Sequence, residues 1–196
     1  MTMDIGFKVL ICLAITDFLS GFFHWLEDRY GDLKWPVVGK HVIFPNIVHH
    51  LNGRNFVFYS WFRSARVLLV IGAFVIIISH LSGVLNWMIW LIVLIGVNAN
   101  EVHKWSHRSE SENGVFVTIL QKLRLIQMPS HHLKHHRLNK DTHYCILTNF
   151  LNPILDTVKL WRGMEQIIFK ITKVSPRNDK EAFREILSLS LTPNTN

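Results

Sequence analysis

The sequence predicts an all-α protein: an integral membrane helical bundle with about three transmembrane helices, plus cytoplasmic and interfacial helices that carry histidine motifs. Three observations lead to this class. Of 196 residues, 49% are hydrophobic and only 18% are charged, which excludes an intrinsically disordered chain. Three apolar stretches approach the ~20 residues that cross a bilayer as a helix. The chain also has 12 histidines against 2 cysteines, which excludes a disulfide framework and a cysteine-rich zinc module.

The apolar stretches give the expected membrane crossings. The first covers residues 5–25, the second residues 65–81 and the third residues 84–100. A Ser-Gly turn at 82–83 joins the second to the third, so these two are expected to form a helical hairpin. The first stretch has the length of a removable signal peptide, but it lacks a basic leading segment and a small-residue cleavage site. A membrane helix is therefore the favoured interpretation.

Lysine and arginine residues indicate which side faces the cytoplasm. Near the N-terminal end of the first stretch the only basic residue is Lys8, and the hairpin turn has none, so 20 of the 21 basic residues lie on the other side. The positive-inside rule makes that side cytoplasmic and places the N-terminus outside. Eleven histidines share the cytoplasmic side, with His80 as the exception. The net charge of +7 is thereby explained by topology, and a nucleic-acid binder becomes the weakest interpretation.

The C-terminal half is expected to lie along the membrane surface. Residues 144–169 are apolar but interrupted by an Asn-Pro pair and an aspartate, which favours an interfacial or re-entrant segment over a crossing. Residues 115–126 have the pattern of an amphipathic surface helix, and one short helix is expected around 179–189. The simplest organisation is one membrane domain over residues 1–175, followed by a polar tail over residues 176–196.

The strongest local signal for function is the run HHLKHH at residues 131–136. It follows Pro129, which is well tolerated at a helix start. On a helix, His131 pairs with His135 and His132 pairs with His136, so each pair presents two imidazoles on one face. The run also contains HxxHH, in which adjacent histidines can serve two metal ions. Metal coordination is favoured over a solvated helix start or an adventitious, tag-like affinity.

Three further motifs accompany this run. HKWSH at residues 103–107 places two histidines one helical turn apart at the end of the third stretch, and Asn100 extends the polar stripe. This spacing is weak evidence alone, and its position at the membrane boundary strengthens it. His49 and His50 form an adjacent pair, which by itself is unspecific.

The last motif lies on the first stretch, where Asp17, Gly21, His24 and Asp28 share a helical face. A carboxylate within the membrane is costly and usually faces a partner inside the bundle, so Asp17 either supports the site or makes a packing hydrogen bond between spans. Asp28, one turn beyond His24, is placed to accept the second ring N–H of that histidine and so to orient it.

Nine histidines at one membrane depth are candidate metal ligands: His24, His49, His50, His103, His107, His131, His132, His135 and His136. The expected supporting residues are Asp17, Asp28 and Asn100. Outside the pattern lie His41, His80 and His143, of which His143 is close enough to stay a candidate. Imidazole suits zinc, copper, iron and nickel, so the ligands leave the metal open. HExxH and Glu-x-x-His repeats are both absent, which leaves a histidine-rich site for two metals, suited to oxygen activation beside an alkyl chain.

With these motifs the sequence resembles the plasmanylethanolamine desaturase family. That family groups animal and bacterial enzymes that form the vinyl ether bond of plasmalogens with a plant plastid desaturase of phosphatidylglycerol. HKWSH followed at this distance by HHLKHH is the most specific part of a resemblance that covers about residues 14–170. The matching segments are residues 17–32, 36–40, 49–50, 100–107, 131–136, 144–146, 151–152, 161–162 and 165. Residues 51–63 depart from the family's usual Pro-Thr-x-x-Thr-Arg segment, and the additional N-terminal hydrophobic segment of longer members is missing.

The resemblance implies a membrane lipid desaturase domain whose nine histidines bind two iron ions and which uses O2 and two electrons per turnover. Its substrate would be a phospholipid, with either vinyl ether (plasmalogen) formation or desaturation of a phosphatidylglycerol acyl chain as the reaction. No GxGxxG, CxxCH or cysteine cluster is present, so the electrons are expected from a separate cytochrome b5-type protein or ferredoxin. The metal site is expected on the cytoplasmic side of a bacterial inner membrane or an internal eukaryotic membrane.

Two other functions fit the same residues. Similar histidine motifs support oxygen insertion, so a lipid hydroxylase remains open, and the mass of the product separates the two reactions. A non-enzymatic metal sensor or transporter is less consistent with the pattern. A transporter should place ligands along a path through the bilayer, whereas here only Asp17 lies within it.

Overall fold

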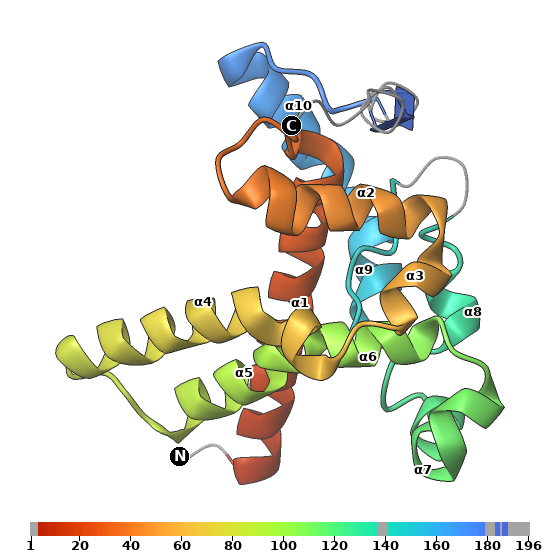
Figure 1. The fold of residues 1–196 in the computed structure, drawn as a ribbon. Coiled ribbons are helices and arrows are strands. Elements are labelled where there is room, and N and C mark those ends of the chain that lie inside the picture. The colour runs from red at the N-terminus through yellow and green to blue at the C-terminus, as the bar shows by residue number, and fades with distance from the viewer. Residues whose placement is uncertain (1–3, 137–140, 179–182, 185, 188–196) are drawn as a thin grey trace, which may run out of the picture.

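The computed structural model describes residues 4–136, 141–178, 183–184 and 186–187. Throughout these residues the regular elements are helical, which confirms the predicted all-α class (Figure 1). In chain order they are α1 (Ile5–Tyr30), the π-helical turn η1 (Gly39–Ile43), α2 (Phe44–Leu51), α3 (Gly53–Val57), α4 (Trp61–Leu81), α5 (Trp87–Val97), α6 (Ala99–Ser106), α7 (Glu110–Lys122), α8 (Pro129–His132), α9 (Leu151–Thr157) and α10 (Leu160–Thr172).

Among the described residues, α1 and α4 are long and apolar enough to cross a membrane. The third predicted crossing is divided. α5 has 11 residues, about 16 Å of helix against ~30 Å of hydrocarbon, and Asn98 separates it from α6. At Asn98 the backbone has φ −95° and ψ 0°, outside the values of a regular helix. That the chain crosses the membrane three times therefore stays a prediction.

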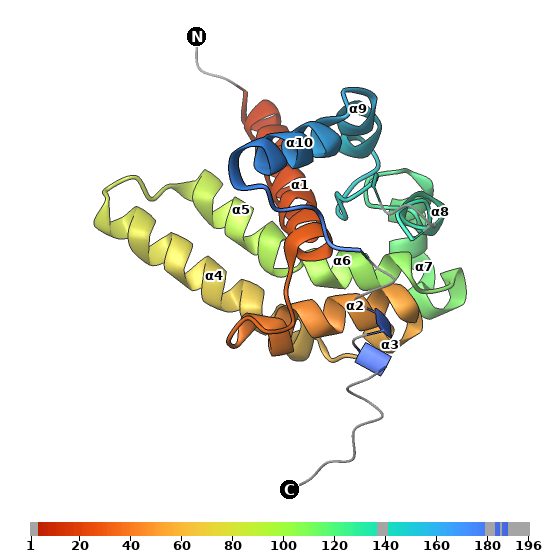
Figure 2. The ribbon, with the colours of Figure 1, turned by 90° about the horizontal axis from the view of Figure 1, so that it is seen from above.

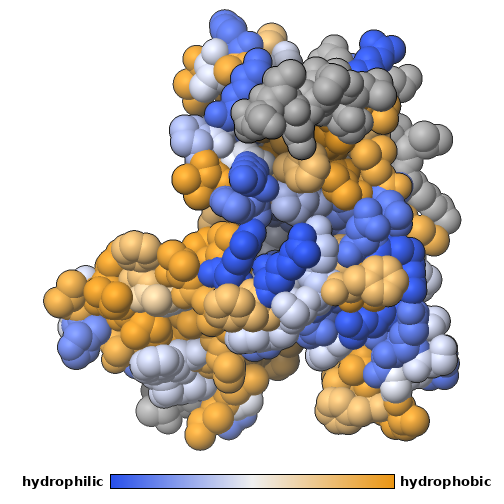
Figure 3. Space-filling model, in the orientation of Figure 1, coloured by the Kyte–Doolittle hydropathy of each residue, from blue (hydrophilic) through white to orange (hydrophobic). Residues whose placement is uncertain are grey.

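The hairpin expected from the Ser-Gly turn is confirmed. α4 and α5 lie side by side (Figure 2), and Gly83 takes a φ of 70° in the turn, which favours glycine. A Cβ atom on Gly72 would lie 2.8 Å from Cγ1 of Val93, so the two helices approach closely at this glycine. The hairpin projects sideways from α1 (Figure 1), and its visible surface is mostly apolar (Figure 3). A continuous apolar surface of this kind suits contact with lipid.

Asp17 makes a packing contact with a loop rather than with another span. Its carboxylate is fully buried and accepts hydrogen bonds from the backbone N–H of Leu147 at 2.9 Å and the hydroxyl of Thr148 at 2.5 Å. One turn later, a Cβ atom on Gly21 would lie 2.9 Å from the backbone nitrogen of Cys145. The loop formed by residues 141–150 therefore docks closely against α1.

An aromatic core holds the same loop against the C-terminal half of α1. Trp25, Tyr144, Cys145 and Trp161 are all buried there, so α1, the loop and α10 share one apolar cluster. The ring centroids of Trp25 and Trp161 lie 5.9 Å apart in a stacked arrangement. Large buried aromatic side chains of this kind fix the position of the segments that carry them.

The surface segments of the C-terminal half are short and interrupted. The region 144–169 contains a loop, α9 and part of α10, so it is interrupted as expected. The Asn-Pro pair lies inside α9, however, and the break between the two helices comes at residues 158–159, where Lys159 takes a φ of 53°. α7 occupies much of the predicted amphipathic segment, but Gly114 breaks it with a φ of 70°. Val115 and Phe116 of α7 and Leu123 just beyond it stay exposed. An apolar patch is visible at the position of α7, at the lower right of Figure 3. The helix expected around 179–189 lies mostly outside the described residues.

Candidate metal centre

Four segments that are far apart in the sequence bring imidazoles together in the interior. They are the C-terminal half of α1, α2, α6 with its following residue, and α8 with the turn after it. These segments supply His24 and Asp28; His49 and His50; His103 and His107; and His132, His135 and His136. The structure thus brings eight of the nine predicted histidines into two groups, and the ninth, His131, lies in neither.

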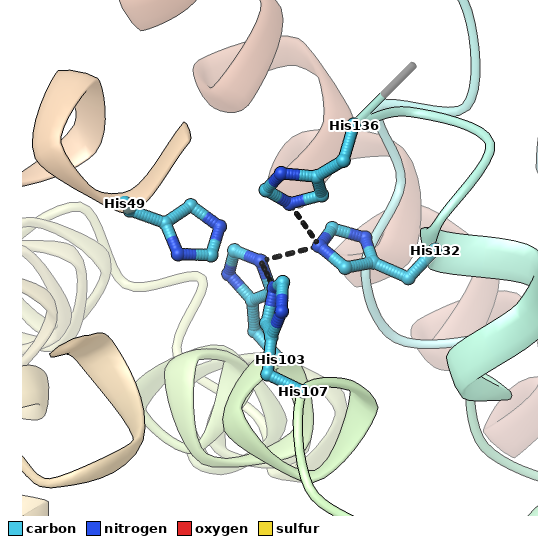
Figure 4. Close-up of side chains that lie close together, drawn as sticks. All are labelled: His49, His103, His107, His132 and His136. Atoms are coloured by element: carbon cyan, nitrogen blue, oxygen red, sulfur yellow. Dashed lines mark hydrogen bonds between the residues drawn. The ribbon is translucent and has the colours of Figure 1, made fainter. Parts of the chain in front are cut away.

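The first group consists of His49, His103, His107, His132 and His136, whose candidate ligand atoms all lie within 4.8 Å of one another (Figure 4). The Nε2 atom of His132 lies 2.8 Å from Nε2 of His103 and 2.9 Å from Nε2 of His136. The Nε2 atoms of His103 and His107 lie 3.4 Å apart. A neutral imidazole nitrogen carries either one proton or one lone pair, so it can make one hydrogen bond. The Nε2 atoms of His103 and His132 each take part in two of these contacts, so the three contacts cannot all be hydrogen bonds.

A single cation fits the first group better than mutual hydrogen bonds. Two imidazole nitrogens bound to one ion at about 2.1 Å would lie about 3.0–3.4 Å apart, close to the observed separations. His49 is 4% exposed, and within the described part of the chain neither of its ring nitrogens has a hydrogen-bond partner. Its ring packs against that of His107 with centroids 4.5 Å apart. Because an unpaired buried polar atom is costly, the ring nitrogens of His49 fit a role as metal ligands.

The second group consists of His24, Asp28, His50 and His135. The Asp28 carboxylate lies at its centre. Oδ1 is 2.9 Å from Nε2 of His50, while Oδ2 is 3.1 Å from Nε2 of His135 and 3.7 Å from Nε2 of His24. Oδ1 also accepts a hydrogen bond from the side-chain amide of Asn46 at 2.6 Å. Three imidazoles and one carboxylate form a donor set that suits iron or zinc.

The position of Asp28 differs from the expected supporting role. That role required the outer ring N–H of His24 to face Asp28, but the Nδ1 atom of His24 lies 3.2 Å from the carbonyl oxygen of Tyr144. The Nε2 atom therefore faces the carboxylate, and Asp28 becomes a candidate ligand. His135 has the same arrangement, because its Nδ1 atom lies 2.9 Å from the carbonyl oxygen of Thr142. A backbone acceptor on Nδ1 fixes the tautomer that presents Nε2 to a metal.

Burial keeps the imidazoles of the first group uncharged at neutral pH. Desolvation, followed by repulsion from neighbouring imidazoles, lowers the pKa of His103 and His132 well below the usual value. The same causes lower the pKa of His107 to about 4. Neutral rings retain the lone pairs that bind metal ions, so protons compete little with a metal near pH 7.

This electrostatic arrangement predicts acid instability of the metal-free chain. Histidines of the unfolded chain titrate near pH 6.5, whereas the folded His107 remains neutral until about pH 4. The unfolded state therefore binds more protons in this window, and the free energy of unfolding should fall as the pH drops from about 6.5 to about 4. Each such histidine contributes about 1.4 kcal/mol per pH unit. Denaturant unfolding of chelator-treated protein at pH 7 and pH 5 measures the change, and equal stabilities would contradict it.

His131 lies outside both groups because α8 ends at His132 and the chain then turns. The expected helical pairing of His131 with His135 therefore does not form. Instead the ring centroid of His131 lies 4.7 Å from that of His143, and its Nε2 atom lies 3.2 Å from the side-chain amide nitrogen of Asn152. His143 in turn has its Nδ1 atom 2.7 Å from the carboxylate of Asp156.

The remaining polar residues hold the helices in place. Asn100 donates a hydrogen bond to the carbonyl of Ser64 at 2.7 Å, so it ties α6 to α4 rather than supporting a histidine. Asp17 likewise binds the loop formed by residues 141–150. His41 lies 3.1 Å from Arg66, and His80 occupies the last turn of α4. Sequence reasoning missed Asn46, which contacts Asp28; the sequence offers no motif that marks it.

The fold and the site together define an all-α protein with candidate membrane helices and two buried groups of side chains that fit metal ions. Residues 13–179 match the protein family described as the lipid desaturase domain. The chain belongs to this family, which confirms the resemblance found in the histidine motifs and places the chain among oxidoreductases.

Several relatives carry desaturase names. The chain is 25% identical to a probable fatty acid desaturase of Acanthamoeba polyphaga mimivirus, over 93% of this chain and 92% of that protein. It is 28% identical to plasmanylethanolamine desaturase 1 of Mus musculus, over 84% of this chain. It is 30% identical to the plasmanylethanolamine desaturase of Myxococcus xanthus, over 87% of this chain. The aligned region spans 65% of the mouse protein and 63% of the bacterial one. No solved structure matches the chain.

Proposed function

We propose that the chain is a membrane desaturase that introduces a double bond into an alkyl or acyl chain of a phospholipid at a di-iron centre. Desaturation of plasmanylethanolamine, the activity named for the mouse and Myxococcus relatives, is the favoured reaction, and here it would form a vinyl ether. The observation that carries the proposal is the pair of adjacent ligand groups: the rings of His50 and His136, one from each group, have centroids 4.7 Å apart. Two groups this close can hold two metal ions that act together.

The reaction balances with molecular oxygen and an external reductant. A saturated carbon pair, O2, two electrons and two protons give one double bond and two molecules of water. Two bound iron ions would supply the oxygen activation that removes hydrogen from unactivated carbons. The described residues contribute ligand positions, neutral imidazoles and a buried site from which bulk water is excluded. A separate cytochrome b5-type protein or ferredoxin would deliver the electrons.

The proposed membrane position follows from the apolar surfaces and the charges. The exposed apolar hairpin of α4 and α5 would lie among lipid chains, with the ligand groups at the cytoplasmic boundary. Arg63 and Arg66, in the first two turns of α4, would attract the phosphate of a lipid head group. The guanidinium of Arg63 lies over the ring of Tyr59, 3.8 Å from its centroid, which holds it at this boundary.

Comparative lipidomics tests the function directly. Cells that express the full chain aerobically, with a competent electron donor, should accumulate phospholipids that have lost two hydrogens. An acid-labile product would identify a vinyl ether, whereas an acid-stable one would identify an acyl double bond. A gain of one oxygen would identify a hydroxylase and overturn the desaturase. Absence of every such product, with the protein correctly inserted in the membrane, would overturn the proposed enzyme and favour a metal sensor or transporter.

A further inference from the structure

The loop formed by residues 141–150 places two of its peptide groups against the second ligand group. The first is the peptide that joins Thr142 to His143. Its carbonyl oxygen lies 2.9 Å from Nδ1 of His135. Its N–H, on the opposite edge, donates to the carboxylate of Asp156, at 3.2 Å and 3.3 Å from the two oxygens. One planar peptide thus connects a carboxylate to a candidate ligand.

The second peptide repeats this arrangement. It joins Tyr144 to Cys145, and its carbonyl oxygen lies 3.2 Å from Nδ1 of His24. Its N–H donates to the side-chain oxygen of Asn152 at 2.9 Å. The Asn152 side chain is fully buried, and its amide donates in addition to the Cys145 carbonyl at 2.8 Å. The Nδ1 atoms of His24 and His135, which point away from the candidate metal, each contact a peptide carbonyl. The N–H of each of these peptides donates in turn to a side chain of α9.

Asn152 and Asp156 are both on α9, four residues apart, so they share one face of the helix. Two histidines outside the ligand groups, His131 and His143, also contact this face. His143 takes a φ of 61°, an uncommon value for a residue with a side chain, and its Nδ1 atom lies 2.7 Å from Asp156. His131 contacts the amide of Asn152. These contacts give a structural role to two histidines that lie outside both ligand groups.

We propose that α9 is the positioning element of the second metal site, and that Asn152 and Asp156 orient His24 and His135 through the two intervening peptides. The inference rests on the proposed di-metal function and adds residues to it. A carboxylate that accepts the peptide N–H polarises the peptide, which makes its carbonyl a stronger acceptor for the Nδ1–H of His135. Such outer contacts raise the basicity of a metal-bound imidazole and fix its tautomer.

The two ligand groups provide an internal control for this role. Within the described residues, no hydrogen bond joins α9 to His49, His103, His107, His132 or His136. A loss of fold would weaken both metal sites, whereas a loss of positioning would weaken the second site alone. The spectrum of a metal bound at the second site adds a readout that overall stability does not affect.

The experiment is a Co²⁺ titration of the purified full chain, followed by visible absorption and by competition with a chelator. The variants Asp156→Ala and Asn152→Ala should lower the affinity of the second site for Co²⁺ by about 10–100-fold and change the spectrum of the ion bound there. The affinity of the first site should stay unchanged. Asp156→Asn, which keeps an acceptor for the peptide N–H, should restore much of the affinity. Glu110→Ala is the matched control, because it removes an exposed carboxylate whose partner among the described residues is Lys122, at the surface.

The outcomes separate this inference from the function on which it rests. Unchanged second-site binding in both alanine variants would overturn the positioning role while leaving the di-metal site intact. Equal weakening of both sites, with no rescue by Asp156→Asn, would show a structural effect and also overturn it. A wild-type chain that binds fewer than two Co²⁺ ions would overturn the proposed di-metal function itself.

Discussion

Replacing His132 by alanine should remove the first metal ion and lower turnover by about 10³-fold or more. His132 is 1% exposed, and its Nε2 atom contacts the Nε2 atoms of both His103 and His136. No other ring in the first group has two such short contacts. Loss of this central ligand leaves an incomplete donor set, and the metal contributes several kcal/mol to oxygen chemistry of this kind. Product formation per molecule of membrane-inserted protein is the measurement.

His80→Ala is the control for this variant. His80 is in the last turn of α4, and neither ligand group includes it. The substitution removes an imidazole from the same chain and should leave metal content and turnover unchanged. A His132→Ala protein that retained its first metal and normal turnover would contradict the role of the first group.

Replacing Asp28 by alanine should remove the second metal ion while the first group keeps its own. The carboxylate is 2% exposed and lies within 3.7 Å of the Nε2 atoms of three histidines. Alanine removes a negative charge that would compensate a bound cation, so product formation should fall to background. Asp28→Asn should fail as well, because an amide keeps the shape of the side chain but not its charge.

The size of the effect distinguishes a ligand from a supporting residue. Loss of a residue that only orients a ligand costs about 10–100-fold in metal affinity, so some second-site binding would persist. Loss of a ligand should leave no measurable metal binding at the second site. Asp32→Ala, which removes an exposed carboxylate just beyond α1, is the control and should bind two ions. Normal two-metal binding in Asp28→Ala would contradict the second group.

The helical class and the grouping of most histidines could be predicted because they depend on local spacing. Apolar runs mark α1, α4 and α5, and the four-residue spacing of His103 with His107 and of His132 with His136 places each pair on one side of its segment. The hairpin was predictable from its Ser-Gly turn. The interruption at Asn98 was not, because an apolar run does not show where a helix breaks.

The differences between the predicted site and the structure arise from where the chain turns and from contacts between distant segments. His131 was grouped with its neighbours on the assumption that α8 continues, and the chain turns after His132 instead. Asp28 was predicted to support His24, but the Tyr144 carbonyl, 120 residues away, takes the outer nitrogen. Asn152 and Asp156 had no predicted role because the contacts that give them one are with backbone groups of the loop, which no side-chain motif reveals.

Iron content of the purified full chain, measured together with product formation on the same sample, tests the central claim most directly. Two complete ligand groups predict about two iron ions per active chain, with Asp28→Ala and His132→Ala each holding about one and forming no product. A wild-type sample that forms unsaturated phospholipid while holding one iron ion or none would contradict the di-iron centre.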